Sequence, residues 1–161
     1  MRNATVALAA IAALAGGESA LAQLPSKPVL NLQASQTVMD AAEAHARANG
    51  WNVVITIVDD GGHPILLRRM DGTQIGSVEV ALEKARSAVA FRRPTRALNE
   101  LVSAGNVAVL RLPGAMPVEG GIPLMWEGQM IGAIGVSGVT AQQDGQIAQA
   151  GVEALSSAGG P

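Results

Sequence analysis

The fold is decided by residues 51–91, which read WNVVITIVDDGGHPILLRRMDGTQIGSVEVALEKARSAVAF. Residues 53–58 form a β-branched apolar run typical of a buried strand, and residues 64–70 form a second apolar run. Between them, Asp59-Asp60-Gly61-Gly62 predicts a hairpin loop, because glycine enters positive φ without steric cost. Apolar residues then recur at helical spacing as far as Phe91. The stretch therefore predicts a strand, a hairpin, a second strand and a helix.

Further elements are expected on both sides of this unit. Asn49-Gly50 is a helix-stop signal and ends a first helix over 35–48. After residue 91 the predicted elements are a short helix over 96–103 capped by Thr95, an apolar run at 107–112, a strand leading to Met125, a turn at 126–129, a strand over 130–137 and a last helix over 140–155. Strands joined by hairpins, with helices before, between and after them, predict an α+β fold. We expect a single domain with a central antiparallel sheet of about five strands covered by helices.

Composition limits the classes of partner. The 161 residues suffice for one domain, and the only aromatic side chains are Trp51, Phe91 and Trp126, so the core must be aliphatic. The formal net charge is −2 and no basic tract occurs, which argues against nucleic acid because phosphate binding needs clustered Lys and Arg. The absence of cysteine excludes disulfides, thiolate metal sites and a cysteine nucleophile.

The start of the chain has the pattern of a secretory signal. Arg2 provides a positive charge, residues 4–15 are apolar, and Ala20-Leu21-Ala22 is a small-x-small cleavage site. We predict a signal peptide over 1–22 and a periplasmic or secreted protein, with no membrane span left after cleavage because the apolar run is too short. The alternative is a buried or anchoring N-terminal helix. An extended arm over 23–31, a domain over 32–155 and a tail over 156–161 complete the predicted organisation.

Four motifs together resemble a known family. They are VDDGGHPILLRRMDG (58–72), SxxxAxxKARSAxxF (77–91), EGGIPL (119–124) and GAIGVSG (132–138). In this order they are similar to the GlcG/HbpS family (DUF336), a heme-binding or heme-degrading group that includes the C-terminal domain of PduO-type adenosyltransferases. The resemblance implies an α+β domain that assembles into homo-oligomers and binds heme. In some extracellular members it implies slow iron-dependent heme breakdown, or redox sensing through a partner protein. It supplies no general catalytic residue.

Heme binding requires an iron ligand, and imidazole is the ordinary one. His45 lies near the boundary of the apolar face of the first predicted helix, and the resemblance favours it because some PduO-type relatives ligate heme through a histidine of that helix. His63 lies in the predicted hairpin loop, where a polar side chain is usually only solvated. Each histidine could therefore instead be a solvated surface residue that binds no ligand. Methionine is the other conceivable ligand, although it more often fills gaps in a core; the candidates are Met70, Met116, Met125 and Met130.

Charged residues of the deciding stretch supply candidate anion and metal contacts. Arg69 and Lys84, within the family-like motifs, are candidates to hold a heme propionate, and Arg68 and Arg86 lie nearby in sequence. The alternative is internal ion pairing of these cations with the acidic residues Asp59, Asp60 or Asp71. Glu79 and Glu83 share one helix face and are candidate iron ligands by resemblance. Their spacing differs from the i,i+3 pair associated with that role, which favours a solvated face instead.

Three functional hypotheses follow. The first is an exported heme-binding protein that carries, buffers or senses heme. The second is a periplasmic enzyme or binding module for a small organic acid, held by Arg68, Arg69 and Lys84. The third is an oligomeric accessory protein. The glycines of 120–138 either let a flat ligand approach the backbone or serve close packing. A phosphate loop and a GxSxG hydrolase elbow are both missing from the sequence.

Overall fold

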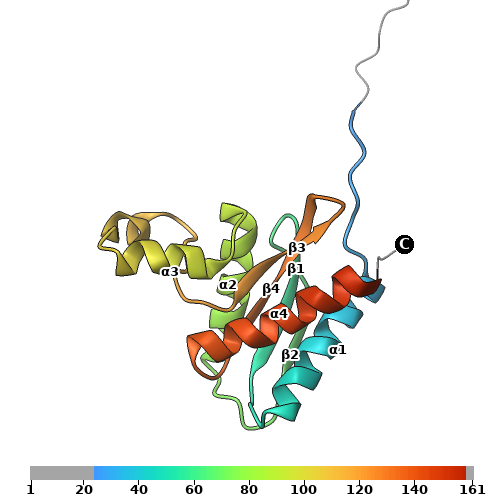
Figure 1. Ribbon diagram of the computed structural model, residues 1–161, viewed down its shortest axis with the longest axis horizontal. Coiled ribbons are helices and arrows are strands. Elements are labelled where there is room, and N and C mark those ends of the chain that lie inside the picture. The colour runs from blue at the N-terminus through green and yellow to red at the C-terminus, as the bar shows by residue number, and fades with distance from the viewer. Residues whose placement is uncertain (1–23, 159–161) are drawn as a thin grey trace, which may run out of the picture.

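The computed structural model describes residues 24–158 (Figure 1). Its elements, in chain order, are α1 (Leu32–Ala48), β1 (Val54–Asp59), β2 (Pro64–Arg69), α2 (Ser77–Phe91), α3 (Thr95–Ser103), the 3-10 helix η1 (Val107–Arg111), β3 (Gly121–Trp126), β4 (Gln129–Ser137) and α4 (Ala141–Ala158). The predicted signal peptide over 1–22 lies outside the described residues. Residues 24–31 contain no helix or strand, and residues 156–158 of the predicted tail belong to α4. None of the helices in this described part is long and apolar enough to cross a bilayer.

The strands form one antiparallel sheet in the order β2-β1-β4-β3. This confirms a single α+β domain, but the expected number of about five strands is wrong, because the described sheet has four. The apolar run at 107–112 supplies no further strand and forms η1 instead. Only Val109 of η1 is buried, whereas Val107 and Leu110 are 64% and 58% exposed. A run that buries one side chain gains little from joining a sheet, so it coils beside α3.

Helices cover both faces of the sheet (Figure 1). On one face α1 and α4 pack side by side, and on the other lies α2. The larger core cluster, under α1 and α4, is built from long aliphatic side chains such as Val38, Ile55, Ile57, Ile134 and Ile147. The smaller cluster, under α2, consists of Val58, Ala85, Ala88, Val89 and Ala133. Because most of these side chains are small, α2 lies very close to the strands.

Two helix starts differ from the prediction for local reasons. α1 begins at Leu32 and not near Ser35, because the Asn31 side chain accepts the Ala34 N–H at 2.8 Å and caps the helix there. Thr95 is the first residue of α3 and not its cap, which is Pro94. The Thr95 hydroxyl is buried and accepts the N–H of Gly121 at 2.9 Å. A residue predicted as a local cap therefore links α3 to β3.

Both predicted hairpins are present. In the β1–β2 loop the Asp59 carboxylate accepts the N–H groups of Gly61 and His63, each at 2.9 Å. The His63 N–H is the largest cause that lowers the pKa of Asp59, the Gly61 N–H adds to it, and partial burial opposes them. The β3–β4 turn places Glu127 and Gly128 at φ values of 47° and 76°. Positive φ at both central residues is the geometry that suits the twist of a two-residue hairpin.

The glycines of β3 and β4 serve close packing. A Cβ on Gly135 would overlap the backbone of α2 at Ala81, and one on Gly121 would overlap the carbonyl group of Lys84. Gly132 and Gly138 meet the backbone of Val58 and Asn52 in the same way. Of the two interpretations left open by the sequence, these contacts support packing of sheet against helix and strand. Because glycine has no side chain, α2 can pack directly on the middle of the sheet.

Replacing Gly135 with alanine tests this contact. The new methyl group would press on the α2 backbone at Ala81 and Ala85. A helix backbone cannot move aside as a flexible side chain can. We expect a loss of about 3 kcal/mol in the free energy of unfolding, measured by urea denaturation. Gly76→Ala is the matched control, because a Cβ there meets nothing within 4 Å. It should change stability by less than about 1 kcal/mol. Equal stabilities of the two variants would contradict the packing argument.

Candidate functional site

A cavity of about 480 Å³ opens where α1, α3, β3 and α4 meet. We call it the His45 cavity. The described lining residues come from four segments of the chain and are His45, Pro94, Arg96, Glu119, Gly120, Gly121, Ile122, Gly145, Gln146, Gln149, Ala150 and Glu153. The size lies within the range of small-molecule sites in proteins. Of the residues predicted to bind a cofactor, only His45 lines this cavity.

His45 reaches the cavity from the last turn of α1. Its neighbours Ala42 and Ala46 are fully buried against the core, which leaves the imidazole half-buried at the edge of the packed face. The ring lies against Trp51, with centroids 6.1 Å apart and planes inclined at 55°. Within residues 24–158 neither ring nitrogen takes part in a hydrogen bond or ion pair. A half-buried imidazole with free nitrogens beside a cavity can bind a metal centre or a ligand proton.

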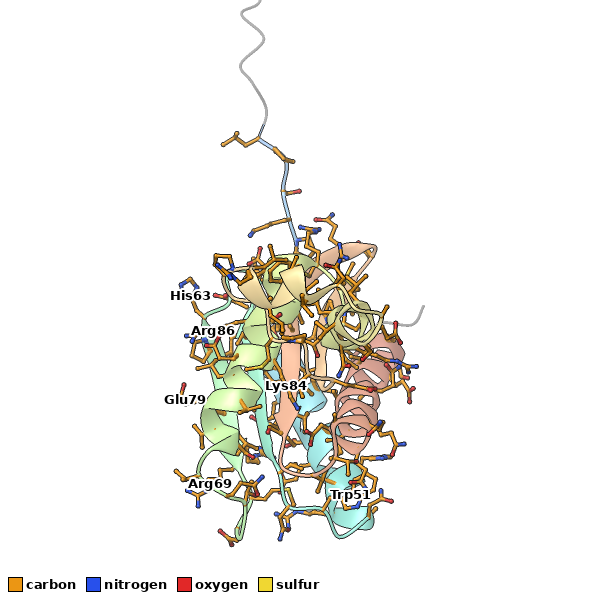
Figure 2. All side chains as sticks on the ribbon, turned by 90° about the vertical axis from the view of Figure 1, so that its left-hand side faces the viewer. Trp51, His63, Arg69, Glu79, Lys84 and Arg86 are labelled. Atoms are coloured by element: carbon orange, nitrogen blue, oxygen red, sulfur yellow. The ribbon has the colours of Figure 1, made fainter. Side chains whose placement is uncertain are left out.

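Lys84 does not reach the cavity, because the backbone of Gly120 and Gly121 lies between its side chain and the cavity. The side chain is 1% exposed, and its Nζ donates to Asp144 Oδ2 at 2.8 Å and to the Val136 carbonyl at 2.9 Å. Figure 2 shows Lys84 inside the molecule, between α2 and the sheet. Gly120 separates the ammonium from the cavity, because a Cβ there would lie 2.9 Å from Nζ. The ion pair considered as an alternative for Lys84 exists, but its partner is Asp144 and not one of the hairpin aspartates.

The Lys84–Asp144 pair is a buried charge pair on the core side of the site. Burial raises the pKa of the Asp144 carboxyl, while the Lys84 ammonium and the N–H groups of Val139 and Gly138 oppose that rise. Asp144 also accepts the Val139 N–H at 3.2 Å, which holds the first turn of α4. Each charge is thus compensated by several hydrogen bonds. A pair of this kind tolerates removal of one partner poorly.

The arginines predicted to act with Lys84 do not gather around it. Arg68 Nη1 bonds to Asp40 at 2.9 Å and also to Glu43, so it joins β2 to α1. Arg69 Nε donates to the Thr73 carbonyl at 3.1 Å. In Figure 2, Arg69 lies far from Lys84, near the lower end of the molecule. The anion site proposed from Arg68, Arg69 and Lys84 is therefore not formed by these three residues.

The other predicted ligands lie on the outer surface of the α2 side. His63 is 81% exposed by its side chain, with Nδ1 3.3 Å from Asp59 Oδ1. Glu79 is exposed, and Glu83 pairs with Arg86 at 2.9 Å. Figure 2 shows His63 and Glu79 along one side, away from Trp51. Across residues 24–158, no three His, Asp or Glu side chains gather as a metal site would need.

Several lining residues were not predicted. Arg96, Glu119 and Gln149 come from α3, from the loop before β3 and from α4, and each looks like an ordinary surface residue in the sequence. Arg96 Nε donates to Glu100 at 2.9 Å, which directs the guanidinium along α3. The packing of α3 against β3 through Thr95 brings Arg96 to the cavity that contains His45.

The chain matches a described family over most of its length. The family described as "Haem degrading protein HbpS-like" matches residues 30–153. The chain belongs to this family. Protein GlcG of Escherichia coli (strain K12) is 38% identical over 114 residues, which are 71% of this chain and 85% of GlcG. The resemblance stated from the motifs is thereby confirmed.

Solved structures of family relatives have the same fold. A structure of HbpS superposes with a TM-score of 0.75 at 30% identity and covers 83% of this chain and 94% of that one. A structure described as a PduOC:heme complex superposes with a TM-score of 0.72 at 30% identity, covering 79% of this chain and 95% of that one. The second of these relatives therefore holds heme on this fold.

Replacing Lys84 with methionine tests the buried pair behind the cavity. The variant leaves the Asp144 carboxylate buried without its ammonium partner, so we expect a loss of about 3–5 kcal/mol in the free energy of unfolding. The double variant Lys84→Met/Asp144→Asn removes both charges and should recover most of this loss. Urea denaturation at pH 7 measures all three chains. If Lys84→Met alone were as stable as the wild type, the pair would have no structural role.

Proposed function

We propose that this protein binds heme in the His45 cavity, with the imidazole of His45 as the iron ligand. The observation that supports it most directly is the half-buried ring of His45 beside the cavity, free of other hydrogen bonds within the described chain. The heme complex of a relative with the same fold adds support from an independent direction. His63 lacks such support, because its side chain is 81% exposed in a hairpin loop.

The lining of the cavity suits one edge and face of a porphyrin. Pro94, Ile122 and Ala150 offer apolar surface, and the backbone of Gly120 and Gly121 forms a wall without side chains. Bound heme would supply a redox-active iron at His45. The residues of this chain would orient the ring and shield one of its faces from water.

The charges at the rim decide where the propionates would lie. Among the described residues that line the cavity, Arg96 is the only cationic one, whereas Glu119 and Glu153 are acidic. Like charges repel, so the propionates should point to Arg96 or to solvent and away from the two glutamates. A single exposed arginine contributes little to binding free energy. Most of the affinity for heme would therefore come from the His45–iron bond and from the apolar surface of the cavity.

A hemin titration followed by absorbance tests the site. The wild-type chain, residues 23–161, should give a saturable shift of the Soret band. His45→Ala should weaken binding at least tenfold, because it removes the proposed iron ligand. His63→Ala is the matched control, since it removes the other histidine of the chain from an exposed loop. Absence of a saturable shift in the wild type would refute heme binding, and an unchanged His45→Ala spectrum would refute only the ligand assignment.

We further propose that the protein carries, buffers or senses heme, with slow heme degradation as a candidate second activity. Among the described residues that line the cavity, His45 is the one imidazole that could bind the iron. The family description names heme degradation, and a direct measurement tests whether this chain degrades heme. Loss of the Soret band under reductant and air, faster in the wild type than in His45→Ala, would assign that activity to the site.

We propose that the working form is a homo-oligomer. Large apolar side chains of α3, η1 and the following loop are exposed: Leu101 by 39%, Val107 by 64%, Leu110 by 58% and Leu112 by 45%. Single exposed apolar residues are common on protein surfaces, but several of them on one segment are typical of a protein–protein contact. Light scattering of the wild type and of Val107→Glu/Leu110→Glu would decide, with the smaller mass expected for the double variant.

The signal peptide predicted over 1–22 makes export part of this proposal. Expression of the full chain in a Gram-negative host should place the protein in the periplasm, with a mass that begins at Gln23. Ala22→Arg should block cleavage, because the peptidase site requires a small residue there. Mass spectrometry of the periplasmic and cytoplasmic fractions measures both. Accumulation of the uncleaved wild-type chain in the cytoplasm would contradict export.

A further inference from the structure

A second cavity of about 500 Å³ lies beneath the β1–β2 loop, at the C-terminal end of α2. We call it the hairpin cavity. Its lining includes the charged residues Asp60, Arg86 and Arg92 and the apolar residues Val89, Ala90 and Met130. None of these lines the His45 cavity. Figure 2 shows Arg86 on the side of α2 and the hairpin, and Trp51, the neighbour of His45, on the other side.

Arg92 reaches this cavity from an unusual backbone conformation. Its φ and ψ are 51° and 40°, in the left-handed region, where a residue with a Cβ is strained. Helices often end on such a residue, but glycine is the usual choice. In the described chain only Glu127 shares a positive φ without being glycine, and its hairpin turn accounts for it. The Arg92 N–H bonds to the Val89 carbonyl at 3.2 Å and the Arg93 N–H to the Ala88 carbonyl at 3.3 Å, the bonds of a left-handed helix ending. This ending accounts for the backbone conformation and places Arg92 among the residues that line the cavity.

Arg86 is held at the opposite wall. Its Nε donates to the Gly62 carbonyl of the hairpin loop at 3.3 Å, and its Nη1 bonds to Glu83 at 2.9 Å. One edge of the guanidinium is thereby fixed, and the remaining N–H groups are available to a ligand. Arg92 forms no ion pair with any residue of the described range 24–158.

The balance of charge in the hairpin cavity is positive. Asp60 is the only acidic residue among the described lining, and it pairs with Lys27 of the segment that precedes α1. Glu83 faces Arg86 from the same helix and compensates part of its charge. Arg92 remains uncompensated above an apolar floor formed by Val89, Ala90 and Met130.

We propose that the hairpin cavity binds a small organic acid with an apolar body. The carboxylate would bind between Arg86 and Arg92, whose planar guanidinium groups suit bidentate carboxylate contacts. The apolar body would lie on Val89, Ala90 and Met130. A bare inorganic anion would leave this floor uncovered. The site goes beyond heme binding and shares no residue with it, so either assignment can fail without the other.

Calorimetric titration with matched ligands tests the proposal. Hexanoate and benzoate should bind saturably to the full mature chain, at least tenfold more tightly than hexanamide, benzamide, acetate or inorganic phosphate. The amides keep the apolar body without the charge, and acetate and phosphate keep the charge with little or no body. Equal binding of the amides, tighter binding of phosphate, or no saturation by either acid would overturn the assignment.

Variants locate the site. Arg92→Gly removes the guanidinium but keeps the left-handed backbone, so the fold and its melting temperature should not suffer. It should weaken benzoate binding at least tenfold, as should Arg86→Gln. Arg93→Gln is the matched control, because this neighbouring exposed arginine does not line the cavity, and it should leave the affinity within twofold. Unchanged affinity in both Arg92→Gly and Arg86→Gln would refute the site.

The two sites are separated by a competition experiment. Benzoate affinity should be the same for the wild type, for His45→Ala and for protein saturated with hemin. Displacement of benzoate by hemin would instead mean that one site takes both carboxylates, which contradicts a separate hairpin site.

Discussion

The buried pair of Lys84 and Asp144 is the contact on which the arrangement of the site depends. Lys84 extends from α2 and binds both the Val136 carbonyl of β4 and the Asp144 carboxylate at the start of α4. It therefore joins the helix on one face of the sheet to the helix on the other. The desolvation of two charges is a large cost, which only complete hydrogen bonding of both groups offsets. Any displacement of α4 relative to α2 would break that compensation.

The wall of the His45 cavity follows from this pair. Gly120 and Gly121 pass so close to Lys84 that a side chain at either position would collide with its ammonium or its carbonyl. Gly145 similarly leaves room for the Glu119 side chain against α4. The smooth wall that a flat ligand would need is thus a consequence of close packing around a buried charge. Of the two interpretations that the sequence left open, the structure supports close packing, and approach of a flat ligand to this wall stays a prediction.

The sequence predicted features whose signals are local. Helical periodicity gave α2, and Asp59 with the following glycines gave the first hairpin, since the carboxylate bonds to N–H groups only two and four residues away. Contacts between residues that are far apart in the sequence could not be predicted in this way. Lys84 and Asp144 are 60 residues apart, and Arg68 finds its carboxylates on α1 rather than in the adjacent hairpin. The apolar run at 107–112 misled the strand count because hydrophobicity alone does not reveal which side chains become buried.

The anion site predicted from charges in the sequence did not form, whereas the predicted ligand His45 does line a cavity, and its role as iron ligand stays a prediction. His45 needed only its place on an amphipathic helix and a family pattern to be singled out. The cations from which that site was predicted each form a different structural contact: Arg68 with Glu43, Arg69 with the Thr73 carbonyl, and Lys84 with Asp144. Arg92, in contrast, lines the hairpin cavity and has no carboxylate partner within residues 24–158, so the ligand site proposed there is built on it. Neighbours in space, and not in sequence, are therefore the basis of the ligand proposed for each cavity: heme beside His45, and a carboxylate beside Arg92.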